Sequence, residues 1–415
     1  MKLTFYFPYQ QISGVPILFA GIVNNISSFE NIETIYVIDY ENGALNRLIK
    51  DSKVIERIYF KDRVKVMVPE DTILIMQSII PYMIREELII SSKTKILFWN
   101  LHPENLIPNF IPIHFINNYI KSKYHLFKKI IDVVFKIRLD KIKNFIELSL
   151  KRNGLVFMDR TNIYNTSYKL NLEIPNNLKY LPVPIEITKD KKRIDNKKNI
   201  SVSWVGRVEG FKYFILKYIL EEFSDYCNEN KIQINFHLIG DGLKLHQLNS
   251  KNFNSNYFKL KNHGNLDYKD LKNFLKNNID LAFAMGTSAL DSANLSIPTV
   301  LVDYSFKRIR NYKFRWIFDT KDFDLAHDVY NNNYTGPSYE ISDLVQQFIK
   351  NKKEFASKSR DYVFRNHDIN LISKLFVKYA RDTKLIFGDV DRNILKKSIF
   401  RLLYYKFNNY YTGTS

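Results

Sequence analysis

The chain has 415 residues, a formal net charge of +19, 45% hydrophobic residues and a single cysteine, Cys227. The length indicates two or three domains, and the apolar content is that of a folded protein. One cysteine excludes a disulfide framework and a cysteine-based zinc site, which is typical of a reducing compartment. The positive charge indicates an anionic partner: nucleic acid, a membrane surface or a phosphorylated substrate.

No apolar run approaches ~18 residues, so the sequence predicts no membrane-spanning helix. Residues 2–7 are too short and too aromatic to be a signal peptide.

The first half contains short apolar runs that are typical of buried parallel strands. These runs cover residues 2–7, 34–38, 55–60, 72–76, 95–99 and 155–159. Helical spacing follows at 17–26, after the loop Ser13-Gly14-Val15-Pro16. The backbone at Gly14 is therefore placed either to approach a bound ligand or to make an ordinary strand–helix turn. Residues 162–167 are expected to form a polar loop.

His102 lies just beyond the predicted strand 95–99. Open α/β sheets hold reactive groups at the carboxyl ends of their strands. His102 could therefore act as a base or bind substrate, and a loop histidine with neither role fits the pattern equally well.

Residues 114–152 form the most basic region, with ten Lys or Arg residues against three acids. Apolar residues recur there at helical spacing: Phe127, Ile130, Ile131, Val134 and Phe135. This pattern predicts a basic amphipathic helical insert suited to an anionic lipid surface, or a solvated helix pair packed on the sheet.

The second half repeats the alternation of strands and helices after a polar, aperiodic stretch. Strands are expected at 199–205, 232–239, 258–260, 281–285 and 299–302, and helices at 214–228, 269–277, 289–295, 342–350, 353–366 and 370–383. The predicted fold class is therefore α/β, with two Rossmann-like doubly wound domains facing a central cleft. The predicted domains are 1–184 and 199–385, with a linker at 185–198 and a basic amphipathic tail at 386–415.

The turn Gly286-Thr287-Ser288, between the predicted strand 281–285 and a short helix, is the strongest candidate for a binding site. A glycine permits close backbone approach, and the free N–H groups of the next helix favour phosphate. Asp291, one turn into that helix, is placed to accept hydrogen bonds from a ribose. An ordinary strand–turn–helix would show the same residues.

The second half resembles the nucleotide-binding domain of the GT-B glycosyltransferases, especially the bacterial nucleotide-sugar enzymes that retain anomeric configuration. The matching residues are Trp204-Val205-Gly206-Arg207 with Lys212, His237-Leu238-Ile239-Gly240-Asp241-Gly242, His263-Gly264-Asn265-Leu266, and Gly286-Thr287-Ser288 through Asp291 to Ile297-Pro298. Ser13-Gly14-Val15-Pro16 is similar to the N-terminal glycine loop of that family. The likeness is strongest over residues 200–303.

The resemblance implies a role for each matched residue. Arg207 and Lys212 would hold the donor's diphosphate and stabilise the charge that develops on the leaving group. The other implied donor contacts are Gly264, Asn265 and Leu266 at the base, Thr287 and Ser288 at phosphate, Asp291 at the ribose, and Gly14 in the N-terminal loop. Gly240 and Asp241 are expected to form a turn rather than a ligand contact. No Asp-X-Asp motif stands in a plausible site, so no metal and no cofactor besides the nucleotide-sugar is expected.

The chain departs from the family at one point. Retaining members carry two glutamates; Asp291 takes the place of the second, whereas residues 283–288 contain no acid for the first. An inverting enzyme would need a general base, for which His102 is the best candidate. We favour retention.

The resemblance implies a glycosyltransferase with a polyprenyl-pyrophosphate-linked glycan acceptor, acting in bacterial O-antigen or capsule assembly. We expect a cytoplasmic protein, peripheral on the inner face of the cell membrane through its basic segments, that binds no nucleic acid. A sugar-nucleotide epimerase of GT-B fold and a basic nucleic-acid-binding protein are the alternatives. The sequence contains no helix-turn-helix, zinc-finger or RNP signature that would support the nucleic-acid-binding alternative.

Overall fold

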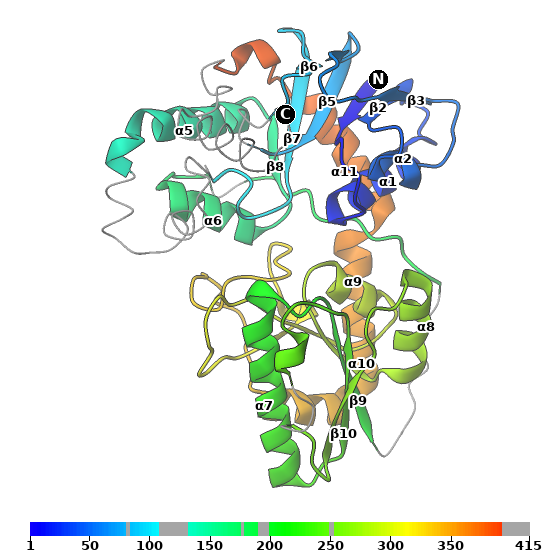
Figure 1. The fold of residues 1–415 in the computed structure, drawn as a ribbon, viewed down its shortest axis with the longest axis vertical. Coiled ribbons are helices and arrows are strands. Elements are labelled where there is room, and N and C mark those ends of the chain that lie inside the picture. The colour runs from blue at the N-terminus through cyan, green and yellow to red at the C-terminus, as the bar shows by residue number, and fades with distance from the viewer. Residues whose placement is uncertain (80–83, 108–131, 176–177, 190–198, 249–252, 392–415) are drawn as a thin grey trace, which may run out of the picture. The chain divides into compact units, whose positions relative to one another are not determined.

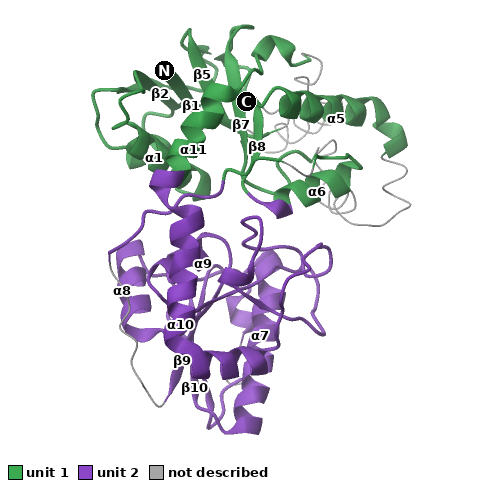
Figure 2. Ribbon diagram, turned by 180° about the vertical axis from the view of Figure 1, so that it is seen from behind, with its two compact units in different colours: residues 1–158, 162–181, 372–415 green, residues 159–161, 182–371 purple. Residues whose placement is uncertain are grey.

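The computed structural model describes residues 1–79, 84–107, 132–175, 178–189, 199–248 and 253–391. The chain divides into two compact units (Figure 2). Unit 1 comprises residues 1–158, 162–181 and the segment from Ile372 onward, and unit 2 comprises residues 159–161 and 182–371. Each unit is built around its own six-stranded sheet.

The unit 1 sheet has the strand order β3-β2-β1-β5-β7-β8, and its paired strands are all parallel. Its strands are β1 (Lys2–Tyr6), β2 (Thr34–Asp39), β3 (Ile55–Tyr59), β5 (Thr72–Gln77), β7 (Lys95–Asn100) and β8 (Leu155–Phe157). A small parallel pair, β4 (Val66–Met67) with β6 (Leu88–Ile89), lies outside this sheet. The near-continuous burial of β1, β5 and β7 explains why they are apolar runs without alternation.

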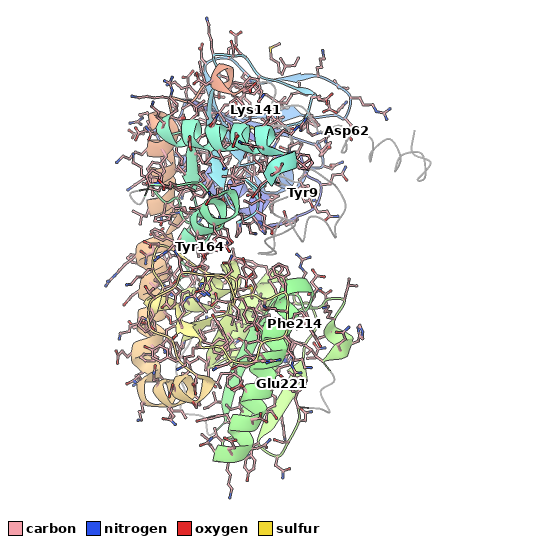
Figure 3. The ribbon with its side chains drawn as sticks, turned by 90° about the vertical axis from the view of Figure 1, so that its left-hand side faces the viewer. Tyr9, Asp62, Lys141, Tyr164, Phe214 and Glu221 are labelled. Carbon is pink, nitrogen blue, oxygen red and sulfur yellow. The ribbon has the colours of Figure 1, made fainter. Side chains whose placement is uncertain are left out.

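Helices cover both faces of the unit 1 sheet (Figure 1). One face carries α1 (Gly14–Ile26), α2 (Ala44–Leu48) and α11 (Ile369–Asp382), and the other carries α5 (Lys136–Lys151) and α6 (Arg160–Leu170). Helix α5 buries Ile142, Phe145 and Ile146, and Phe145 meets Phe98 of β7 edge to face at 5.5 Å. Figure 3 labels Lys141 on α5 and Tyr164 on α6.

The polar loop expected at 162–167 is wrong, because these residues lie inside helix α6. Their side chains bond within the helix, where Thr166 Oγ1 donates to the Asn162 carbonyl at 2.8 Å and Tyr164 stacks on Tyr168. Tertiary burial of Asn162 and Thr166 overrides the weak helix propensity of these residue types.

Most of helix α11 belongs to unit 1, whereas residues up to 385 were expected in the second domain. Its Phe376 stacks on Phe5 of β1 at 5.5 Å and lies 6.1 Å from Trp99 of β7. The following residues join the same unit, since Ile96 N donates to Leu385 O at 2.9 Å. The chain therefore ends its described part on the sheet with which it began.

The unit 2 sheet has the order β11-β10-β9-β12-β13-β14. Its strands are β9 (Ile200–Val205), β10 (Ile234–Ile239), β11 (Phe258–Asn262), β12 (Leu281–Ala284), β13 (Thr299–Leu301) and β14 (Arg315–Trp316). The first five are parallel, and β14 is an antiparallel edge that the sequence pattern did not predict.

Helices cover both faces of the unit 2 sheet as well. Helix α7 (Tyr213–Asn230), on which Figure 3 labels Phe214 and Glu221, shares a core with Phe283 of β12. Helices α8 (Tyr268–Asn278) and α9 (Thr287–Asn294) pack on the other face. The expected helices 342–350 and 353–366 form one helix, α10 (Ile341–His367), with a non-helical residue, Asn351, between them. Short 3-10 turns occur at η2 (Gly210–Lys212), η3 (Leu245–Gln247), η5 (Ile317–Asp319) and η6 (Phe387–Asp389).

The predicted linker, insert and tail lie partly outside the described residues. These parts are 190–198 of the linker, 114–131 of the insert and 392–415 of the tail. The start of the linker is packed rather than free: Ile185 and Ile187 contact the core of unit 2, and Ile185 N donates to His367 O at 2.6 Å.

Candidate functional site

The carboxyl ends of β10, β9 and β12, three neighbouring strands of unit 2, bring the matched motifs to one edge of the sheet. Arg207 follows β9, the loop 240–242 follows β10, and Thr287 begins the helix after β12. Parallel strands place all these turns on the same side, which is where open α/β sheets bind ligands.

Arg207 and Lys212 form a cationic pair in the loop after β9. The Arg207 side chain is 75% exposed and makes an ion pair of 3.0 Å with Glu209. A Cβ built on Gly206 would lie 3.4 Å from Lys212 Nζ, so the ammonium folds back over the start of the loop. Burial lowers the pKa of Lys212, and the neighbouring charge of Arg207 lowers it further. Two cations that repel each other in this way favour binding of an anion.

Gly240 and Gly242 serve the packing of this loop. A Cβ on Gly240 would stand 2.3 Å from Gly206 O, and one on Gly242 would stand 2.6 Å from Val208 O. Both have φ near +140°, at 137° and 145°. The loop after β10 can therefore lie directly against the loop that carries the cations, which agrees with the expectation of a turn here.

The loop Gly264-Asn265-Leu266 is tied to its neighbours by hydrogen bonds. Gly240 N donates to Gly264 O at 2.8 Å, and Asn265 Nδ2 donates to Asp241 Oδ2 at 2.5 Å. Next to the loop, His237 Nδ1 and His263 Nε2 share a hydrogen bond of 2.9 Å. Burial, together with the charges of His263 and Lys261, lowers the pKa of His237 to about 4, so this ring is neutral at pH 7.

Gly286 turns the chain from β12 into α9 with a φ of 60°. No side chain caps this helix, and neither Thr287 nor Ser288 uses its hydroxyl in a hydrogen bond among the residues described here. A short helix therefore begins at the sheet edge with N–H groups and hydroxyls available to an acceptor.

Asp291 is half-buried one turn into α9. Burial raises the pKa of its carboxyl to about 6, although the charge of Lys272 and a hydrogen bond from Tyr268 act in the opposite direction. The Tyr268 hydroxyl donates to Asp291 Oδ1 at 3.4 Å. The carboxylate is thus held between α8 and α9, and it is ionised at neutral pH.

His102 and Gly14 belong to unit 1, whereas the four matched motifs that begin at Trp204, His237, His263 and Gly286 belong to unit 2. Gly14 is the first residue of α1, and an added Cβ would meet nothing within 4 Å. His102 is exposed, and its Nδ1 accepts a hydrogen bond from Glu104 N at 3.2 Å. The neutral ring therefore carries its proton on Nε2, which donates in this state rather than accepting a proton.

Sequence reasoning missed a row of buried polar side chains at the carboxyl edge of the unit 1 sheet. Tyr6 ends β1, Ser78 follows β5 and Asn100 ends β7, and these strands are neighbours. The Tyr6 hydroxyl, the Ser78 hydroxyl and both amide atoms of Asn100 are buried without a hydrogen-bond partner in the described part of the chain. Buried polar atoms are rarely left unpaired, so this row is suited to a polar ligand or ordered water. The sequence did contain a signal for this row, because a polar residue stands at or just after the end of each of these apolar runs.

A buried charge network behind the Gly286 turn was also missed. Asp303 Oδ2 lies 2.5 Å from Arg315 Nη1 and 3.1 Å from His327 Nε2. The network continues to Asp324, whose carboxylate lies 2.8 Å from His327 Nδ1 and 3.4 Å from Arg315 Nη2. The same loop holds the turn, since Gly286 N donates to Leu325 O at 3.3 Å.

No group of three or more His, Cys, Asp and Glu side chains within the described ranges is arranged to hold a metal ion. Among the same residues, no helix is both long and apolar enough to cross a membrane.

No family model matches the chain, and no curated protein sequence matches it significantly. Solved structures do match. The trehalose-6-phosphate synthase OtsA is 11% identical over 93% of this chain and 99% of that chain, with a TM-score of 0.53. The trehalose-6-phosphate structure from E. coli bound with UDP-2-fluoro glucose is 10% identical over 93% and 100% of the two chains, with a TM-score of 0.55.

The chain has the GT-B fold. Two Rossmann-like units, each with a mainly parallel sheet, agree with this assignment and with the fold class expected from the sequence. The S. aureus TarM is similar at 12% identity with a TM-score of 0.42, and the chain spans about half of TarM's length, 55% in that structure and 46% in a second one.

Proposed function

We propose that the chain is a glycosyltransferase that binds a nucleotide-sugar donor on unit 2 and transfers the sugar to an acceptor hydroxyl. The observation that carries this proposal is the cationic pair Arg207 and Lys212 in the loop after β9. Strand β9 pairs with β12, and β12 leads into the uncapped start of α9. A diphosphate is the group that this combination of charges and N–H donors favours.

The proposed chemistry is departure of a nucleoside diphosphate from the sugar. Negative charge grows on the diphosphate as the glycosidic bond to it breaks, and two fixed cations stabilise that charge. Thr287 and Ser288 would donate to a phosphate oxygen, and Asp291 would accept from the ribose hydroxyls. The loop Gly264-Asn265-Leu266 would border the base. These cations supply the stabilisation that a metal ion provides elsewhere, so we propose a metal-independent reaction.

We propose unit 1 for the acceptor. Tyr6, Ser78 and Asn100 present buried polar atoms without partners in the described chain, as a hydroxylated ligand requires. Gly14, the first residue of α1, would allow close backbone approach to the acceptor. With its proton on Nε2, His102 would donate to the acceptor rather than act as its base, and we propose a retaining reaction.

The proposed acceptor is a lipid-linked glycan in bacterial surface polysaccharide synthesis, at the inner face of the membrane. Exposed apolar residues in α5 and just before it support contact with lipid. Val133, Val134 and Ile137 are 76%, 63% and 75% exposed beside the basic residues Lys136 and Arg138. Apolar side chains flanked by cations suit the interface of an anionic bilayer.

The first test measures binding of UDP-, GDP-, ADP- and CMP-sugars by thermal shift and by calorimetry. A UDP-sugar is the first choice, since the E. coli structure of the same fold was solved with UDP-2-fluoro glucose. We expect one donor to raise the melting temperature of the wild type. Arg207→Ala without ligand should melt at the wild-type temperature, but the donor should no longer raise that temperature. Arg365→Ala changes an exposed arginine of α10 and should still show the donor-induced shift. No shift with any donor would refute the proposal.

Product analysis separates transfer from epimerisation, the second candidate for this fold. A transferase yields a glycosylated lipid acceptor and free nucleoside diphosphate. An epimerase would convert the soluble sugar nucleotide and require no acceptor.

A further inference from the structure

Tyr268 occupies an unusual position for a large aromatic residue. It is the first residue of α8 and follows directly after Leu266 and Asp267, where the loop proposed to border the base ends. The side chain nevertheless remains 61% exposed. The ring thus lies exposed at the carboxyl edge of a parallel sheet, which is where open α/β sheets bind ligands.

Two contacts hold this ring in one orientation. Its hydroxyl donates to Asp291 Oδ1 at 3.4 Å, and the ammonium of Lys272, one turn later in α8, lies 4.5 Å from the ring centroid. A cation at that distance covers one face of the ring through the cation–π interaction. The hydroxyl and one face are therefore engaged before any ligand binds.

The other face of the ring is open. No aromatic ring packs against Tyr268 among the residues that the structure describes, and the large exposed fraction is consistent with this. In the loop that precedes α8, a Cβ on Gly264 would meet no atom within 4 Å, so the space beside that residue is open. A flat group could lie on the ring between the loop and Asp291.

We infer that Tyr268 is the stacking platform for the donor's nucleobase, with its hydroxyl orienting Asp291 toward the ribose. The inference rests on the proposed function and adds a donor-binding residue that the matched motifs do not contain. Stacking on an aromatic ring accepts any base, so Tyr268 would supply affinity for the nucleoside, while the loop beside it would select the base.

Calorimetry with two ligands tests this role. Tyr268→Ala should weaken binding of the nucleoside diphosphate recognised by the wild type about 10- to 100-fold, because stacking is lost. Inorganic pyrophosphate, which has no base, should bind the variant as it binds the wild type. Tyr268→Phe keeps the ring and should lose less than about fivefold. Phe364→Ala removes an equally exposed ring from α10 and should change neither ligand.

The outcomes separate this inference from the proposed function. A wild type that binds no nucleoside diphosphate overturns both. A wild type that binds while Tyr268→Ala binds equally well overturns only the stacking role. If Tyr268→Ala weakened binding of the nucleotide and of pyrophosphate equally, the substitution would have a structural effect. That result too would overturn the inference. Should Tyr268→Ala fail to fold, Tyr268→Leu provides the same comparison with a side chain of similar bulk.

Discussion

Arg315 and Asp303 form an ion pair in the interior of unit 2, with 2.5 Å between Nη1 and Oδ2. Both side chains are essentially inaccessible, at 2% and 0% exposure. The pair joins the first residue of β14 to the chain just after β13, and through Asp324 it reaches the loop that holds Gly286. The buried charges thus stabilise the loop that holds the proposed phosphate-binding turn in place.

Removing one charge of this pair should destabilise unit 2. Asp303→Asn removes the negative charge at the shorter contact of the Arg315 guanidinium and leaves the longer one to Asp324, and we expect a loss of about 3 kcal/mol in the free energy of unfolding. Chemical denaturation followed by tryptophan fluorescence measures it, since Trp316 is adjacent to Arg315. Asp225→Asn, an exposed carboxylate on α7, should change stability by less than about 0.5 kcal/mol. A wild-type midpoint in Asp303→Asn would contradict the prediction.

Glu209 would compete for Arg207 with the diphosphate that we propose binds there. Their ion pair of 3.0 Å is exposed to solvent and is worth little, yet its carboxylate occupies part of the guanidinium that would bind phosphate. Glu209→Gln should therefore tighten nucleoside diphosphate binding about two- to fivefold, with the effect decreasing at high salt. Glu221→Gln, which breaks a helical pair with Lys217 on α7, serves as the control. Weaker binding by Glu209→Gln would show that Glu209 positions Arg207 instead.

The raised pKa of Asp291 predicts that donor binding depends on pH. With a pKa of about 6, the carboxyl gains a proton as the pH falls through that value, and it then no longer accepts from both ribose hydroxyls. Affinity for a nucleotide-sugar, whose diphosphate diester does not titrate in this range, should fall about three- to fivefold between pH 7.5 and pH 5.5. Asp291→Asn should bind more weakly and lose this dependence. A flat wild-type profile would remove Asp291 from the ribose site.

Charged substitutions on the exposed start of α5 should reduce membrane binding. Ile137→Asp places a carboxylate three residues after the exposed Val134, and we expect about tenfold weaker partitioning onto vesicles containing anionic lipid. Co-sedimentation with vesicles of phosphatidylglycerol and phosphatidylcholine measures it. Leu371→Asp, at an exposed apolar residue of α11, is the matched control. Equal binding of wild type and Ile137→Asp would exclude this helix face as a lipid contact.

Much of the fold could be predicted from local pattern. Short apolar runs such as 72–76 and 95–99 became the buried strands β5 and β7, because a strand covered on both faces must be apolar throughout. Gly240 was expected in a turn, and the structure shows why: any side chain there would collide with Gly206 O. Helix α6 was missed, since the burial that stabilises Asn162 and Thr166 comes from distant residues.

The sequence by itself determined the two doubly wound units and the order of the matched motifs, because strand periodicity and glycine turns are local properties. Only the tertiary structure decided which polar groups meet. It brought Asp303 to Arg315, Tyr268 to Asp291, and the strand ends of Tyr6, Ser78 and Asn100 to one edge. Such pairings depend on strand order and on the faces of helices, which arise only when the separate segments of the chain pack together.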